Sequence, residues 1–146
     1  PLLRGLPIKS LNLSNTPVLD LEPLCGMPLQ ELELKQMKVR SIEILRGMPI
    51  RDLRMAYLLV TDFEPLLGMP LVVLHMPGTK IKDIGFLTSF PDLEELLLPN
   101  GKVANIERLR TLPKLRYLST VWDPTTSHPA QTVAQFWKEY DAKKKP

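Results

Sequence analysis

Glycine and proline recur along this chain with a fixed period. Glycines stand 21 residues apart at Gly5, Gly26, Gly47 and Gly68. Prolines keep that spacing at Pro7, Pro28, Pro49, Pro70 and Pro91, and Pro113 follows after 22 residues because Asp92 is an insertion. A fixed period of about 20–50 residues is the sequence signature of a repeat architecture, in which each unit buries its apolar side only against its neighbours. This period excludes most other folds for a chain of 146 residues.

Six apolar columns keep the same register as the glycines. They begin at Ile8, Leu11, Leu13, Val18, Leu21 and Leu24, and each recurs through about five units. The third column breaks at Thr120. Leucine alone accounts for 28 of the 146 residues, which this repetition explains. We therefore expect residues 1–121 to form one array of five to six repeats.

Each unit predicts a short strand followed by a tight turn. The alternation in Leu32–Leu34 is typical of a strand with one buried face. The following segment, such as Asp20–Leu24, is too short and too rich in proline for an α-helix and favours a 3₁₀ or extended turn. We expect these turns to be capped by side chains that accept backbone N–H bonds, those of Asp20, Ser41, Asp62, Asp83 and Asn105. Stacked units would then join their strands in a parallel sheet.

The repeat resembles that of the leucine-rich repeat family in its short form of 21–22 residues. It reads L-x-G-M-P-[LI]-x-x-L-x-L-x(4)-[VI]-x-[DSN]-[LIF]-x-x-L and is similar to bacterial repeats of the GMPL type. The resemblance covers about residues 2–120. It implies an α/β solenoid: a right-handed superhelix with a short parallel sheet on the concave face, 3₁₀ or extended turns on the convex face and a C-terminal capping helix.

The repeat departs from the better-known leucine-rich pattern at one position. That pattern has an asparagine whose side chain forms a ladder between turns, whereas this chain has Thr16, Met37, Leu58, Thr79 and Gly101 there. The loop must therefore satisfy its backbone differently, and we expect Met37 and Leu58 to turn inward. A general β-helix is the alternative architecture.

Charge and composition exclude several classes of function. The net charge of +3 comes from Lys143, Lys144 and Lys145, since the other 16 basic residues balance 16 acidic ones. A nucleic-acid site needs a basic stripe on a folded face, so we expect no nucleic-acid partner. No apolar run approaches the roughly 20 residues of a membrane-spanning helix, so we expect no membrane insertion. The single cysteine, Cys25, excludes an intrachain disulfide.

The columns end after Ser119, and residues 122–146 form a different segment. Residues 122–129 are a polar, proline-bounded loop. Thr132 and Gln135 match a capping box ahead of a helix over about 133–142. The apolar side chains of that helix share one face: Val133, Phe136, Trp137 and Tyr140. We interpret this face as a cap over the last repeat, with a stripe that grips a partner as the alternative, and we expect the terminal lysines to be disordered.

No residue pattern indicates catalysis, a cofactor or a metal. The motifs HExxH, CxxC, GxSxG, GxGxxG and the P-loop are absent from the sequence. Cys25 and His75 fall on different edges of the expected solenoid, so they do not predict a dyad. Lys35 and Arg54 lie among the carboxylates of the outer strand face, which favours surface ion pairs over an acid pair. We expect a non-catalytic domain without metal or cofactor.

The outer face of the predicted sheet is the candidate binding surface. Its first half is polar and charged, whereas its second half has apolar side chains with no core beneath them, which favours a protein or peptide partner. The candidate protein-binding residues are Glu33, Arg54, Tyr57, Leu59, Val73, His75, Leu97 and Tyr117. Two other interpretations stay open: residues 121–131 fold back over this patch, or the patch is a contact between copies.

Two functions compete for such an array. The first is a protein–protein interaction module that recognises its ligand on the sheet face. The second is a regulatory or sensor domain of a larger signalling enzyme, such as the serine/threonine kinases that precede similar arrays, with an upstream domain as its partner. Scaffolding within a longer array is a third. Because Pro1 already lies inside a repeat and no targeting segment precedes it, we expect upstream sequence to be missing. The compartment stays open, with a cytoplasmic location favoured.

Overall fold

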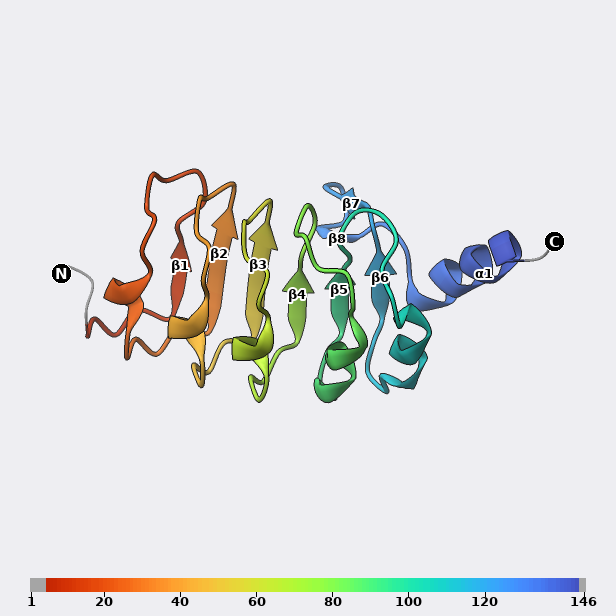
Figure 1. Ribbon diagram of the computed structural model, residues 1–146. Coiled ribbons are helices and arrows are strands. Elements are labelled where there is room, and N and C mark those ends of the chain that lie inside the picture. Colours follow the sequence, from red (N-terminus) through yellow and green to blue (C-terminus); the bar gives the residue numbers. More distant parts are fainter. Residues whose placement is uncertain (1–4, 145–146) are drawn as a thin grey trace.

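The computed structural model describes residues 5–144, which form a solenoid with a single parallel sheet along its length (Figure 1). Six strands lie side by side in chain order: β1 Ser10–Asn12, β2 Glu31–Lys35, β3 Asp52–Ala56, β4 Val73–His75, β5 Glu95–Leu97 and β6 Tyr117–Ser119. Each strand residue pairs with the residue 21 positions later up to β4, as in Leu32 with Leu53. Beyond β4 the offset is 22, because Asp92 is inserted. The predicted parallel sheet and its register are confirmed.

Five 3₁₀ turns lie on the other side of the core. They are η1 Glu22–Leu24, η2 Glu43–Leu45, η3 Glu64–Leu66, η4 Gly85–Ser89 and η5 Ile106–Thr111. The predicted caps at Asp20, Ser41, Asp62 and Asp83 are confirmed, since each accepts the backbone N–H two residues later at 2.8–3.2 Å. The predicted cap at Asn105 is wrong. Its backbone is left-handed, with φ 64°, and its side-chain amide instead donates to both carboxylate oxygens of Asp83.

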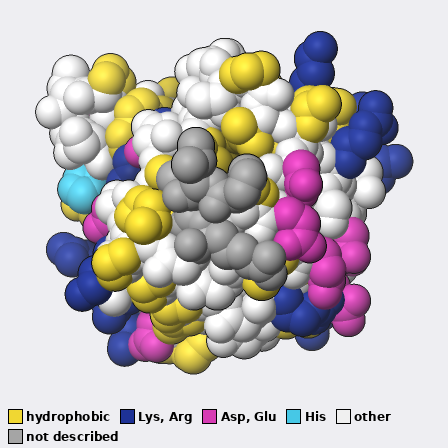
Figure 2. All heavy atoms as spheres, turned by 90° about the vertical axis from the view of Figure 1, so that its left-hand side faces the viewer, with side chains coloured by type: hydrophobic (Ala, Val, Ile, Leu, Met, Phe, Trp, Pro, Cys, Tyr) yellow, Lys and Arg dark blue, Asp and Glu magenta, His cyan; other side chains and the backbone are white. Residues whose placement is uncertain are grey.

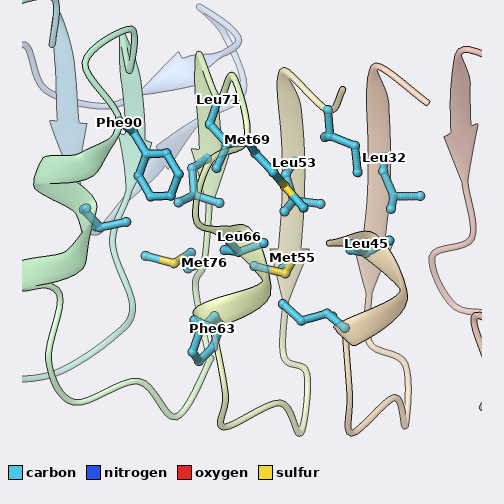
Figure 3. Packing of buried hydrophobic residues seen from close by; sticks show 14 of the residues in the cluster. Leu32, Leu45, Leu53, Met55, Phe63, Leu66, Met69, Leu71, Met76 and Phe90 are labelled. Carbon is cyan, nitrogen blue, oxygen red and sulfur yellow. The ribbon is translucent and has the colours of Figure 1, made fainter. Parts of the chain in front are cut away.

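The core fills the space between the sheet and the turns (Figure 3). Leu32 and Leu53 point inward from the strands and meet Leu45 and Leu66, which come from the turns. All four are fully buried, and burying a leucine side chain stabilises a fold by about 1.5–3 kcal/mol. A unit that buries a few such residues is stable only because the next unit covers its other side.

The loops after the strands satisfy their backbones by a direct ladder. The N–H groups of Asn15, Gln36 and Tyr57 donate to carbonyls of the next repeat at 2.9 Å each. All three residues have left-handed backbones, with φ of 60°, 54° and 55°. In the fourth loop the N–H of Gly78 instead donates to the side-chain oxygen of Asn100 at 2.8 Å. Met37 and Leu58 are buried, as predicted.

The C-terminal helix α1 (Val133–Lys144) packs against the last repeat. Thr132 and Gln135 form the predicted capping box, with each side chain accepting the other's backbone N–H. Trp137 is buried in the core cluster, and the Arg110 guanidinium of η5 lies 3.9 Å from the centre of its ring. Among the described residues, no helix is long and apolar enough to cross a membrane.

The helix extends further than the sequence predicts. It runs to Lys144 rather than 142, and the Lys144 ammonium contacts the Glu107 carboxylate on η5. The prediction of disordered terminal lysines is therefore wrong for Lys143 and Lys144, while Lys145 lies outside the described residues.

The opposite end of the array is less well buried. Leu11 on β1 and Leu13 just after it are only partly buried, whereas their counterparts Leu32 and Leu34 on β2 are fully buried. Figure 2 looks onto this end, where hydrophobic side chains gather between charged ones. Within the described residues, β1 pairs with β2 alone.

Residues predicted as a polar loop form a small antiparallel hairpin. Its strands are β7 (Trp122–Asp123) and β8 (His128–Pro129), with Trp122 opposite Pro129. Asp123 organises the turn by accepting bonds from the backbone and hydroxyl of Thr125 at 2.8 and 2.6 Å. The hairpin lies beside β5 and β6, on the same side as the outer face of the sheet (Figure 1).

Candidate functional site

One row of residues crosses the outer face of the sheet, which we call the sheet face, from strand to strand. The strand register places side by side Asn12, Glu33, Arg54, His75, Leu97 and Ser119, which we call the central row. Exposure falls along this row. Asn12 is exposed and Glu33 and Arg54 are half-buried, whereas His75 and Leu97 are each only 4% exposed and Ser119 is fully buried. The sheet face therefore has an open half over β1–β3 and a covered half over β4–β6.

The open half consists of paired polar side chains. Ser10 on β1 donates to Glu31 on β2 at 2.8 Å. Along the central row, Asn12 donates to Glu33 at 3.3 Å. Such contacts across neighbouring strands hold the side chains in a regular layer.

The charges in the open half are also paired. The Arg54 guanidinium binds both carboxylate oxygens of Asp52 through Nε and Nη2 at 2.9 Å. Lys35 Nζ lies 2.9 Å from Glu33 Oε2. Exposed pairs of this kind contribute only about 0–1 kcal/mol to folding, so this layer is available to a partner at little cost in stability.

The hairpin covers the other half. His128 stacks on Tyr117 with ring centres 4.5 Å apart and planes within 4°. Its Nδ1 lies 2.7 Å from Glu95 Oε1, a close polar contact rather than a straight hydrogen bond. Trp122 packs its edge against His75 at 5.0 Å. These contacts shield His75 and Leu97 from water, while Val73 and Tyr117 stay half-buried.

The eight candidate residues differ in how much of each side chain is exposed to solvent. His75 and Leu97 lie beneath the hairpin, so the expectation that they are exposed is wrong. This is the arrangement in which residues 121–131 fold back over the patch. Glu33, Arg54, Leu59, Val73 and Tyr117 are half-buried, and Tyr57 is 58% exposed.

Tyr57 combines exposure with an unfavourable backbone. Its φ of 55° lies in the left-handed region, which bulky side chains rarely adopt. Its counterparts in the first two repeats are Asn15 and Gln36, and the next repeat has Gly78. A Cβ on Gly78 would lie 2.2 Å from the Tyr57 ring, so the missing side chain makes room for that ring. Because neither burial nor backbone preference explains a tyrosine here, we regard it as a functional candidate.

A small cavity lies where the two halves meet. It measures about 210 Å³ and is lined by Lys35, Arg54, Ala56, His75, Pro77, Leu97 and Trp122. The Arg54 guanidinium carbon lies 5.8 Å from the centre of the Trp122 ring, so the hairpin edge reaches the open half. Trp122 is not among the residues that the sequence indicates as binding candidates, and its one signal is a large aromatic side chain in an otherwise polar segment.

His75 and Leu97, each 4% exposed, are the most buried residues that line this cavity. The Nε2 atom of His75 is buried without a hydrogen-bond partner among the described residues. Burial lowers the pKa of His75 to about 3, and the positive charges of Arg54 and Lys35 add to that effect. The imidazole is therefore neutral at physiological pH.

The described residues show no sign of a metal centre: they contain no group of three or more His, Cys, Asp or Glu side chains that could hold an ion. Cys25 is half-buried, on the far side of the core from the sheet face and next to η1.

The helix α1 borders a wider groove. The groove measures about 940 Å³ and runs between the helix, with Phe136 and Tyr140, and the last loops, with Val103 and Val121. Phe136 and Tyr140 also pack on the core. Covering the last repeat is therefore the first role of this aromatic face, as expected for a cap.

Comparison with known proteins shows similarity at the level of structure. No protein-family model and no curated protein matches the chain. An internalin (inlF) from Listeria monocytogenes superimposes on 77% of this chain with a TM-score of 0.71 and 26% sequence identity. An internalin C2 (inlC2) from the same organism superimposes on 74% with a TM-score of 0.69 and 32% identity. Both are leucine-rich repeat proteins, and the chain has this fold. It spans 34% and 49% of those two chains.

Proposed function

We propose that this chain is a non-catalytic repeat module that binds a protein or peptide on the open half of the sheet face. The observation that carries the proposal is Tyr57, an exposed aromatic side chain held in a left-handed backbone and seated over Gly78. Tyrosine anchors many interfaces because it buries a large area and has few rotamers to immobilise. The similarity to internalins supports a binding scaffold of this kind.

The surroundings of Tyr57 fit that role. Glu33, Lys35 and Arg54 lie on β2 and β3, the second of which ends just before Tyr57, and their paired charges would form a polar rim. Rim charges mainly affect association rate and salt dependence, whereas a buried aromatic anchor sets the lifetime of a complex. The alternative function, regulation of a fused kinase, differs from this proposal only in the identity of the partner. An upstream domain of the same chain could bind the same surface.

The test is quantitative capture of partners by the immobilised chain from the lysate of its source cells. We expect the variant Tyr57→Asn to lose about 2 kcal/mol or more in binding, which is a loss of affinity of about thirtyfold or more. Asparagine tolerates the left-handed backbone, so this variant keeps its fold. The matched control is Leu67→Asn, which removes an exposed apolar side chain beside η3. Equal capture by the wild type and Tyr57→Asn would contradict the proposed surface.

A further inference from the structure

The cavity between the hairpin and the open half has the size of one side chain. Its volume of about 210 Å³ is below the roughly 300–1,000 Å³ of pockets that hold small-molecule ligands. Ala56, Pro77, Leu97 and Trp122 give it apolar walls. A partner that docks on the sheet face could insert one residue here.

His75, which lines the cavity, has an unsatisfied polar atom. His75 is 4% exposed, and its buried Nε2 has no partner among the described residues. Leaving a buried polar atom unpaired costs about 1–3 kcal/mol, which the fold recovers if a ligand supplies the missing hydrogen bond.

The charges at the rim indicate the chemistry of that ligand. Lys35 and Arg54 line the cavity, and no carboxylate does. The two bonds from Arg54 to Asp52 use Nε and Nη2, so Nη1 remains outside that pair. The Lys35 ammonium has three N–H donors, and its contact with Glu33 needs only one. Both cations can therefore donate to an anion in the cavity without giving up their present partners.

We propose that this cavity binds the carboxylate side chain of an acidic residue of a protein partner, with His75 at the floor and Lys35 and Arg54 at the rim. This inference rests on the proposed function, because the acidic residue belongs to the partner bound on the sheet face. A carboxylate accepts several hydrogen bonds at once, so it can meet the imidazole and both cations together.

Binding of the carboxylate is linked to protonation of His75. The charged groups around this imidazole are Arg54 on β3, Lys35 and Glu33 on β2, and His128 on β8. In the free chain the two cations oppose a third positive charge. A bound carboxylate reverses that balance and raises the pKa of His75. Affinity therefore increases only as the pH falls toward this raised pKa, in mildly acidic solution where a glutamate carboxylate is still ionised.

The probe for this site is N-acetyl-L-glutamate amide, followed by NMR of the histidine ring protons of the labelled chain. Its neutral analogue, N-acetyl-L-glutamine amide, is the control ligand. We expect the glutamate probe to perturb the His75 resonances and to raise the pKa of His75 by about one to three units. Equal responses to the two ligands, or no response at His75 up to the solubility limit of the probe, would overturn the proposal.

Two variants distinguish the effect of the charge at the cavity rim from the effect of the chain's net charge. Lys35→Met should weaken the response to the glutamate probe several-fold, whereas Lys38→Met removes a lysine from the exposed loop after β2 and should leave the response unchanged. An equal loss in both variants would assign the binding to net charge and overturn the site. Because the probe needs no partner, a failed titration alongside intact Tyr57-dependent capture rejects the cavity alone. If the titration succeeds but partner capture is the same with and without the Tyr57 side chain, only the proposed surface is rejected.

Discussion

The two halves of the sheet face have the same repeats and the same register but different surroundings. Over β1–β3 the face is open, and its side chains pair with one another across neighbouring strands. Over β4–β6 the hairpin β7–β8 covers it and buries His75 and Leu97. An identical place in the repeat is thus a surface position in one strand and a buried position two strands later. In a solenoid, position within the repeat determines whether a side chain points outward, but a neighbouring segment determines whether it meets water.

The two halves should differ most in the loss of folding stability that follows when the charge of a central-row residue is changed. Leu97→Glu puts a carboxylate beneath the hairpin, where an uncompensated charge costs about 3–5 kcal/mol of folding free energy. Glu33→Leu, two strands outside the covered half, should change stability by about 0.5 kcal/mol. Urea unfolding of the two variants checks this contrast, and similar losses in both would remove the distinction between the halves.

Removing the hairpin's main contact should convert the covered half into an open one. Trp122 is half-buried, so Trp122→Ala is expected to cost about 2 kcal/mol, less than the 3–5 kcal/mol of a fully buried tryptophan. The variant should also let water reach His75 and raise its pKa, since burial is the main cause of the lowered value. NMR titration of His75 measures this rise. Trp122→Phe, which keeps a ring at this place, should retain most of the shift, and an unchanged His75 pKa in Trp122→Ala would show that the hairpin is not the cover.

The covered half should make the chain sensitive to mild acid. The pKa of His75 is about 3 in the folded chain, against about 6.5 for an unfolded histidine. The unfolded state therefore binds a proton first, so this contribution to stability is complete above about pH 6.5 and is lost as the pH falls toward 3. The loss is about 1.4 kcal/mol per pH unit, or about 2 kcal/mol at pH 5.

His75→Phe serves as the reference for this dependence, because it fills the same place without a titrating group. Urea unfolding at a series of pH values should show the wild type losing stability more steeply than this variant below about pH 6.5. Parallel curves for the two proteins would mean that His75 is not shielded from water.

The smallest expected change in stability is at Tyr57, at the edge of the open half. Tyr57→Asn should raise stability by about 1 kcal/mol, because asparagine adopts the left-handed backbone at less cost. The reverse exchange in the previous repeat, Gln36→Tyr, should lower stability by a similar amount. Thermal melts of both variants provide the measurement. A Tyr57→Asn variant that is less stable than the wild type would show that the ring has a structural role over Gly78.

Much of the fold follows from short-range features that recur in the sequence. Leu53 and Leu74 are buried and Arg54 points outward, because alternation along a strand needs only the backbone geometry of neighbouring residues. The Asp and Ser caps are equally local, since each side chain bonds to the backbone two residues later. The prediction fails for Asn105 because its left-handed backbone turns the side chain toward Asp83 in the preceding repeat.

The candidate site depends more on contacts between distant segments. The apolar half of the sheet face is evident from the residues, but its cover is not, because Trp122 and His128 belong to a segment outside the repeat pattern. The cavity unites residues from β2, β3, β4, β5 and the hairpin, which are separated by up to 87 positions between Lys35 and Trp122. The repeat period links the strand residues, such as Arg54 with His75, but it does not link them to Trp122, which lies outside the repeats.

The sequence by itself determined the repeat length, the parallel sheet, the apolar columns and the cap at the C-terminal end, since these depend on residues that recur in register or lie within one turn of a helix. Tertiary structure alone decided which half of the sheet face is open, why His75 stays neutral and where a side-chain cavity forms. The physical reason is that solvent exclusion and electrostatic environment depend on everything that surrounds a group in space. In this chain a short hairpin outside the repeats supplies that environment.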